Sequence, residues 1–409
     1  MAPSFGCTEP AGTAYLGSLA SLYARGRIKA VNISADINTV KNTLAVYYPA
    51  GGRKFTGLEY AAALGLKSGD YKRGLQCLSE ASTEGIIEAV RLVASGVVKV
   101  LADRDSGSYR VSVEVRSDAG AVNAAAENSH LNVTALTLNG RKVDFKSPSY
   151  IPVVPSGFRA GFSQMLLAAH GADRSDLAVV RKIIGLNMEA MKESCRRGYA
   201  PPRLLKILKK RNASCAEAGL LLKGAVEMRM NGEAVPVYAV SGSGNTGLSL
   251  TLPLMYSPFG KKGGDRLKRA FILASLVNSR VRESIGITGP LCSAYLAGGA
   301  GLCSAYGFLS GAEPRAIEAG AALFILSAQG LFCNGAGPLC PGKLSTMPLL
   351  AFNCSAAYAG GKGCRQNGAL SLDKALKGLE VLMKSKNTAL NRDITVMMKK
   401  LSLKNKISG

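Results

Sequence analysis

The chain has 409 residues, a formal net charge of +24 and 47% hydrophobic residues. This length and hydrophobic content predict a compact protein with two or three domains, each with its own core. The first ten residues contain no basic stretch followed by an apolar one, so we expect no secretory signal, a cytoplasmic location and reduced cysteines.

Four segments without any charged residue are about as long as a membrane span. They are rich in Gly, Pro, Ser and Asn, whose freed backbone groups would be costly in lipid. We therefore predict that these segments form buried helices and loops of a large core, and we expect no membrane association. The segments are Ala234–Gly260, Ser284–Gly311, Ala319–Gly342 and Leu344–Gly361.

The positive charge is concentrated in blocks such as Lys206–Arg211 and Lys399-Lys400. Lysines and arginines in these blocks alternate with Leu, Ile and Met at helical spacing, as on a solvated helix face. Aromatic residues that could stack on bases do not interleave with them. We therefore expect no nucleic-acid partner, although a positive field would help to steer an anionic substrate.

Residues 1–150 alternate strand-like and helix-like patterns, which predicts an α+β domain with a largely antiparallel sheet. The Asn139-Gly140 pair predicts a tight hairpin turn. The expected strands are Ile28–Ile37, Leu44–Tyr48, Tyr109–Arg116, Val133–Leu138 and Arg141–Val143, and the expected helices are Ala14–Arg25, Gly57–Leu66 and Thr83–Ala94.

A proline-rich passage at Ser147–Gly157 predicts the domain boundary, and residues 151–409 are expected to form a mainly α-helical domain. The expected helices there are Leu177–Arg197, Pro202–Lys223, Asp265–Glu283, Ala316–Gln329, Leu372–Lys386 and Asn391–Leu403.

Two short motifs have the composition of functional sites. Cys7, in Phe5–Pro10, precedes a predicted helix, and a cysteine at that position can be favoured as a thiolate; a chance cysteine is the alternative. Ser241–Gly247 alternates glycines with hydroxyl and amide side chains, so its backbone N–H groups could bind a phosphate or a carboxylate. Glycine-rich turns without any ligand are also common.

Three cysteines, Cys292, Cys333 and Cys340, lie in charge-free loops. The six residues between Cys333 and Cys340 include two glycines and a proline, and we expect this loop to be buried. The spacing matches neither a zinc finger nor a ferredoxin. From spacing alone, buried structural thiols and a metal site are equally plausible.

Four segments together resemble the iron–sulfur L-cysteine desulfidase family, which is related to the iron–sulfur L-serine dehydratase alpha chain. The Ser129–Asn132 turn also falls where that family has a turn like Gly-Gly-His-Thr-Asn. The four segments are Gly6–Pro10, Lys41-Asn42 with Tyr48–Gly52, Ser241–Gly247, and Cys333–Cys340 followed by Lys343–Thr346.

The resemblance implies a 4Fe–4S cluster with three protein ligands, Cys292, Cys333 and Cys340, and one iron left open as a Lewis acid. It implies a non-redox β-elimination of L-cysteine to sulfide, pyruvate and ammonia, with Cys7 as the base. It also implies a homodimer, and no PLP. The residues expected to bind the amino-acid substrate are Lys41, Asn42, His130, Ser241, Ser243, Asn245 and Lys343.

Several alternatives remain open at this point. His130 could equally be a buried structural histidine. His170 has no motif around it, and we expect it to be structural. L-serine could replace L-cysteine as the substrate of the same lyase. Ser241–Gly247 could instead be the phosphate cup of a PLP enzyme, or the fold could serve a binding protein without catalysis.

Overall fold

The N-terminal lobe is built on a six-stranded sheet with the strand order β5-β2-β6-β7-β8-β9. Strands β2 and β5 run parallel and the other neighbours are antiparallel, so the sheet is mixed, with the largely antiparallel character that we predicted. The strands are β2 (Ile28–Asp36), β5 (Val98–Asp103), β6 (Arg110–Ser117), β7 (Gly120–Glu127), β8 (Val133–Leu138) and β9 (Arg141–Lys142). The parallel pair is possible because a long connection with three α-helices separates β2 from β5, the crossover that parallel strands require.

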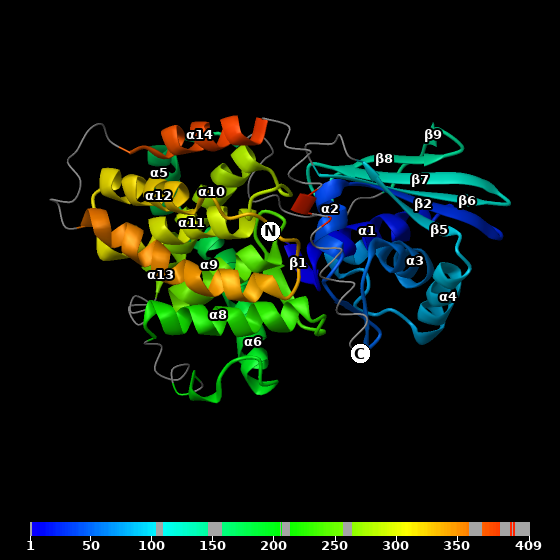
Figure 1. Cartoon of the computed structure of the whole chain (residues 1–409), viewed down its shortest axis with the longest axis horizontal. Coiled ribbons are helices and arrows are strands. Elements are labelled where there is room, and N and C mark those ends of the chain that lie inside the picture. The colour runs from blue at the N-terminus through cyan, green and yellow to red at the C-terminus, as the bar shows by residue number, and fades with distance from the viewer. Residues whose placement is uncertain are drawn as a thin grey trace.

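Three helices cover one face of this sheet: α1 (Thr8–Ala20), α3 (Leu58–Ser68) and α4 (Thr83–Ala94) (Figure 1). Every residue of α1 is buried, because it packs against α3 on one side and the sheet on the other. The close approach depends on Gly65, where a Cβ would lie 2.0 Å from the carbonyl oxygen of Ala14. The helix that follows Cys7 is therefore fixed in the core of this lobe.

The structure is a computed structural model that describes residues 2–103, 109–145, 158–204, 206, 213–256, 264–359, 370–384, 393, 394 and 396. The predicted boundary at Ser147–Gly157 lies outside these residues, as does most of the predicted helix Asn391–Leu403. The division into domains at residue 150 stays a prediction.

The second lobe is helical, as predicted, and its centre is α11 (Ser293–Ser310), which packs against α9, α10, α12 and α13. Glycines permit this packing: a Cβ on Gly301 would lie 2.3 Å from the carbonyl oxygen of Ala274. The other helices are α5 (Phe162–Gly171), α6 (Arg174–Arg196), α8 (Cys215–Met230), α9 (Gly244–Tyr256), α10 (Asp265–Ile285), α12 (Pro314–Ala328), α13 (Leu339–Ala359) and α14 (Leu372–Lys384).

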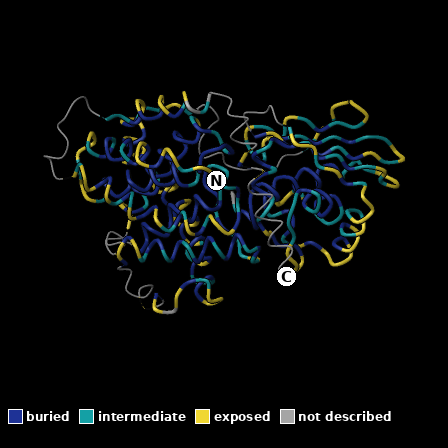
Figure 2. The backbone as a smooth tube through the Cα atoms, in the orientation of Figure 1, coloured by how far each residue is buried: buried dark blue, intermediate teal, exposed yellow. Residues whose placement is uncertain are grey.

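The charge-free segments contribute helices to this core, but only α9 and α11 are buried along most of their length (Figure 2). Helices α12 and α13 bury one side only, with Leu326 and Leu349 exposed, so the predicted burial is wrong for much of Ala319–Gly342 and Leu344–Gly361. Residues of α9 and the central part of α11 are buried on all sides, a pattern typical of a core helix. In the described part of the chain, no helix combines the length and the apolarity that a membrane crossing requires.

Two predicted elements are wrong. Residues 44 and 45 form a bend rather than a strand, and Tyr47 makes only an isolated bridge to Asn231. The short strand is β3 (Tyr48–Ala50), which pairs with β4 (Arg53–Phe55) across a left-handed Gly51-Gly52 turn. The helix predicted at Pro202–Lys223 is interrupted: Pro202–Leu204 is a 3₁₀ turn, and α8 begins only after residue 214. There Ser214 and Glu217 form a capping box, which starts a new helix.

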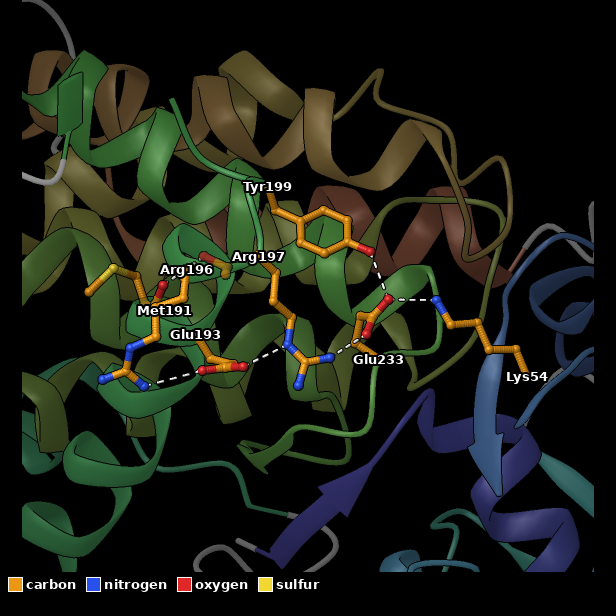
Figure 3. Close-up of polar contacts among 8 residues, drawn as sticks. Lys54, Met191, Glu193, Arg196, Arg197, Tyr199 and Glu233 are labelled. Atoms are coloured by element: carbon orange, nitrogen blue, oxygen red, sulfur yellow. Dashed lines mark hydrogen bonds and ion pairs between the residues drawn. The ribbon is translucent and has the colours of Figure 1, made fainter. Parts of the chain in front are cut away.

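The two lobes are joined by strand pairing and by ion pairs. Strand β1 (Ala2–Phe5) pairs with β10 (Pro236–Ala239) of the helical lobe. Nearby, Glu233 accepts hydrogen bonds from Lys54 of β4 at 2.5 Å and from the Tyr199 hydroxyl at 2.9 Å (Figure 3). Arg197 links Glu233 to Glu193 of α6 through its guanidinium. These contacts attach the β3–β4 hairpin to the helical lobe.

Candidate active site

A cavity open to solvent lies where the two lobes meet, and residues from both lobes line it. It collects the N-terminal cysteine and all three cysteines that the resemblance assigns to a cluster. It also brings together three of the residues expected to bind substrate. The predicted site residues that line the cavity are Cys7, Asn42, Ser243, Asn245, Cys292, Cys333 and Cys340.

Cys292 and Cys333 are brought together by a short antiparallel bridge between the loops that carry them. The backbone N–H of Cys292 donates to the carbonyl of Leu331 at 2.9 Å, and that of Cys333 donates to the carbonyl of Pro290 at 2.6 Å. Cys340 lies in the first turn of α13, and its thiol donates to the carbonyl of Gly335 at 3.6 Å. Two loops thus present three thiols to the same cavity: one loop carries Cys292, and the other carries Cys333 and leads to Cys340.

Three cysteine thiols at one cavity are the type of donor that an iron–sulfur cluster uses. Burial raises the pKa of Cys292 to about 11 and that of Cys340 to about 12, and neighbouring cysteines of the set raise both further. Among the described residues, no three His, Cys, Asp or Glu side chains are gathered as one metal ion would require. A cluster needs thiolates spread around it, because each cysteine binds a different iron.

The loop between Cys333 and Cys340 is less buried than predicted. Cys333 and Cys340 are half-buried, and the side chain of Phe332 is 46% exposed. The reason is that the loop forms the outer wall of the cavity, with one side toward solvent. Lys343 fixes this wall from behind, since its Nζ donates to the carbonyl of Phe332 at 2.6 Å and to the side chain of Asn334. Lys343 itself does not line the cavity.

Helix α2 (Ile37–Thr43) supports both cysteine loops from the N-terminal lobe. The Nζ of Lys41, fully buried, donates to the carbonyl of Gly289 at 2.9 Å, just ahead of Cys292. Gly335 packs on the backbone carbonyl of Lys41, where a Cβ would approach to 2.7 Å. Lys41 therefore lies behind the cavity wall, whereas the next residue, Asn42, reaches the cavity.

Cys7 is the N-cap residue of α1, which begins at Thr8 and ends at Ala20, earlier at both ends than predicted. Its thiol donates a hydrogen bond to Oε2 of Glu9 at 3.0 Å. Burial raises the pKa of Cys7 well above its ordinary value, and the charge of Glu9 raises it further. The expectation of a thiolate is therefore wrong, because burial and the carboxylate outweigh the helix N-terminus.

Glu9 is a site residue that the sequence-based assignment missed. Its carboxylate also accepts hydrogen bonds from Thr8 Oγ1 at 3.0 Å and from Asn42 Nδ2 at 2.9 Å. Burial opposes ionisation, but His130 and these hydrogen bonds outweigh it and lower the pKa of Glu9. A carboxylate in contact with the Cys7 thiol can exchange a proton with it. The only sequence signal was its place in the Cys7–Pro10 motif.

The glycine-rich motif forms the turn that leads into α9. Ser241 and Gly242 both have left-handed backbones, with φ of 47° and 77°. Ser241 lies away from the cavity, where its Oγ is 2.7 Å from Ser279 Oγ and accepts from Asn278 Nδ2 at 2.9 Å. The start of α9 lies at the cavity, and Ser243 Oγ accepts from the backbone N–H of Thr246 in its first turn at 3.2 Å. Anion binding at this turn stays a prediction.

His130 lies outside the cavity lining and is 1% exposed, with its ring 4.5 Å from that of Tyr109. Neither ring nitrogen has a hydrogen-bond partner among the described residues. Burial lowers the pKa of His130 to about 4, and two nearby arginines oppose its protonation further. At neutral pH the imidazole is therefore uncharged.

We expect acid to destabilise the wild-type protein through His130. Its folded-state pKa of about 4 lies below the ordinary 6.5, so the unfolded chain binds the proton more tightly. The stabilisation is complete above pH 6.5 and is lost as the pH falls toward 4. Urea unfolding should show that, from about pH 7.5 to about pH 5, the free energy of unfolding falls by about 2 kcal/mol more in wild type than in His130→Gln. The exposed His170→Gln should keep the wild-type slope. Equal slopes in wild type and His130→Gln would contradict the assignment.

Known proteins resemble this chain over most of its length. The chain is similar to UPF0597 proteins of Clostridium perfringens strain SM101 (26% identical, covering 97% of this chain and 94% of the relative), Desulfatibacillum aliphaticivorans (27%, covering 97% and 95%) and Desulforapulum autotrophicum (29%, covering 85% and 82%). Residues 120–395, well over half of the chain, match the sequence model of the serine dehydratase alpha chain. The protein therefore belongs to the serine dehydratase alpha chain family.

Proposed function

We propose that this protein is an iron–sulfur lyase that converts L-cysteine to sulfide, pyruvate and ammonia by non-redox β-elimination. The family supports a lyase. The observation that carries the proposal is that Cys7, Cys292, Cys333 and Cys340 line one cavity between the lobes. An L-serine dehydratase with the same site is the alternative, because a hydroxyl and a thiol leave by the same chemistry.

Cys292, Cys333 and Cys340 would hold a 4Fe–4S cluster with three protein ligands. When bound, such a cluster supplies a Lewis acid at its open iron, which stabilises a departing sulfide. Cys7 also lines the cavity, but its thiol is engaged by Glu9, and its charged neighbours are Glu9 and Arg229 rather than the other cysteines. We therefore assign Cys7 to proton transfer and not to the cluster.

Cys7 and Glu9 form the proton-transfer pair of this proposal. The thiol is the resting state of Cys7; during turnover its proton passes to Glu9 across the 3.0 Å hydrogen bond, which leaves a transient thiolate at the cavity. The thiolate takes the α-proton of the substrate, the C–H electrons form the Cα=Cβ bond, and the β-substituent leaves with its own bonding pair. The resulting aminoacrylate hydrolyses to pyruvate and ammonia. Asn42 and Thr8 orient Glu9 for this exchange.

Two further alternatives make different predictions. A PLP enzyme needs a lysine for its Schiff base, and no lysine is among the described residues that line the cavity. Its signature would be a Schiff-base absorption in iron-free protein. A binding protein without catalysis would release neither sulfide nor pyruvate from any amino acid, even with iron incorporated.

The test is to compare substrates under anaerobic conditions. The protein is purified without oxygen, its iron and acid-labile sulfide are determined, and L-cysteine and L-serine are supplied separately. We expect equimolar sulfide and pyruvate from L-cysteine, at a higher kcat/KM than pyruvate from L-serine. A preference for L-serine would overturn the choice of substrate, and the absence of pyruvate from both would overturn the lyase.

A cytoplasmic homodimer is a further proposal, supported by the resemblance alone. Light scattering on the anaerobically purified protein should give twice the 42.6 kDa mass of the chain.

A further inference from the structure

Two arginines that the sequence did not point to line the cavity: Arg229 of α8 and Arg282 of α10. They are buried, with exposures of 3% and 5%. Removing a guanidinium from water is costly unless an anion pairs with it. Within the described part of the chain, their hydrogen-bond acceptors are neutral: Asn245 Oδ1 and the carbonyl of Gly6 for Arg229, and the carbonyl of Ile287 for Arg282.

Arg282 has the larger unmet hydrogen-bonding capacity. Its Nη2 donates to Ile287 at 3.0 Å, whereas its Nε and Nη1 have no partner among the described residues. Glu9 contributes the sole carboxylate among the described residues that line the cavity, against two guanidinium groups. The lining thus holds one guanidinium more than it holds carboxylates, and Nε and Nη1 of Arg282 remain available to an anionic group of a ligand.

The place of Arg282 fits a ligand that reaches both halves of the site. Arg282, Glu9 and Cys292 line the same cavity, and the carbonyl of Ile287 that Arg282 binds belongs to the loop that leads to Cys292. A ligand anion at Arg282 would therefore share the cavity with the Cys7–Glu9 pair and with the cysteines that would hold the cluster. A small α-amino acid has this shape, because one or two bonds separate its carboxylate from the α-proton and the β-substituent.

Arg229 has a different part in the wall. Its Nη2 donates to the carbonyl of Gly6 at 2.6 Å, directly ahead of Cys7, and its Nη1 donates to Asn245 in the first turn of α9 at 2.9 Å. Gly244 packs on the guanidinium, where a Cβ would lie 2.6 Å from Nε. Arg229 thus fixes the Cys7 segment against the N-terminus of α9, and both of its Nη atoms are occupied in doing so.

We propose that Arg282 binds the α-carboxylate of the substrate and that Arg229 is a positioning residue that holds Cys7 and the start of α9 around it. The inference rests on the proposed function for the identity of the ligand as an amino acid. The competing explanation is that the two arginines only offset the negative charge of thiolates bound to iron.

The experiment measures binding as well as turnover, on iron-loaded protein without oxygen. The probes are L-alanine, which has the carboxylate but no leaving group, and ethylamine, which lacks the carboxylate. Calorimetry should detect L-alanine but not ethylamine with wild type. Arg282→Gln should weaken L-alanine binding about 10–100-fold and raise the KM for L-cysteine by a similar factor, with unchanged iron content. The L-alanine affinity of Arg282→Lys should lie between those of wild type and Arg282→Gln.

Arg280→Gln is the matched control, since Arg280 lies on the same helix at 8% exposure, pairs with Asp373 and does not line the cavity. It should bind L-alanine as wild type does. The proposal would be overturned if Arg282→Gln bound L-alanine with wild-type affinity, or if wild type bound ethylamine as tightly as L-alanine. A loss of iron in both Arg282→Gln and Arg282→Lys would also overturn it. If L-alanine binds through Arg282 but no amino acid is turned over, the carboxylate site stands and the lyase fails. If L-cysteine is turned over but Arg282→Gln binds L-alanine as wild type does, the lyase stands and the carboxylate site fails.

Discussion

Replacing Cys7 by serine should lower the rate of sulfide release from L-cysteine by about 10²–10⁴-fold, the usual contribution of a general base. The serine hydroxyl can still donate to Glu9, so the local structure is kept, but it is a far weaker acid than a thiol and will not yield a base through Glu9. Because the three cluster cysteines lie on other segments, the iron content of Cys7→Ser should equal that of wild type. Steady-state kinetics and iron determination on the same sample measure both.

Cys77→Ser is the control for this experiment. Cys77 belongs to the same lobe and has the same exposure as Cys7, 2%, but it lies outside the cavity lining. Its substitution should leave turnover unchanged in correctly folded protein. Normal turnover by Cys7→Ser would move the base elsewhere, and a loss of iron would make Cys7 a cluster ligand.

Serine substitutions of Cys292, Cys333 and Cys340 should have a different effect, namely loss of iron together with loss of all lyase activity. Removing one of these thiols leaves two cluster ligands. Cys7 is then the one other cysteine among the described residues that line the cavity. Iron content and the visible absorption of the cluster measure this loss. We therefore expect these three variants to be inactive and free of iron, whereas Cys7→Ser should be inactive but loaded with iron.

Cys195→Ser is the matched control for Cys292→Ser, since the two cysteines are 7% and 8% exposed and both lie in the helical lobe. Cys195 donates to Met191 within α6 and should lose neither iron nor activity. Full iron loading in all three cavity variants would show that the cysteines line the cavity without binding a cluster.

Much of the fold could be predicted from local patterns. The alternation of Val111, Val113 and Val115 predicted a half-buried strand, and β6 buries those three residues. The parallel pairing of β5 with β2 could not be predicted, because nothing local to either strand specifies its neighbour. The prediction of one helix over Pro202–Lys223 is wrong because Ser214 and Glu217 form a capping box that starts a new helix.

The parts of the site that depend on residue type could be predicted from the sequence. The parts that depend on the tertiary environment of a side chain could not. The cysteines could be named, but the bridge that brings Cys333 to Cys292 is tertiary. The thiol state of Cys7 depends on burial and on Glu9, neither of which the motif reveals. Arg229 and Arg282 resemble ordinary helical arginines in the sequence, and only packing turns them toward the cavity.

The most direct test of the account is the dependence of turnover on iron. Wild-type protein is stripped of iron, reconstituted anaerobically, and assayed for sulfide and pyruvate from L-cysteine in both states. The account predicts an inactive iron-free protein and, after reconstitution, about four iron atoms per chain with equimolar sulfide and pyruvate. Full activity in the iron-free state would contradict it.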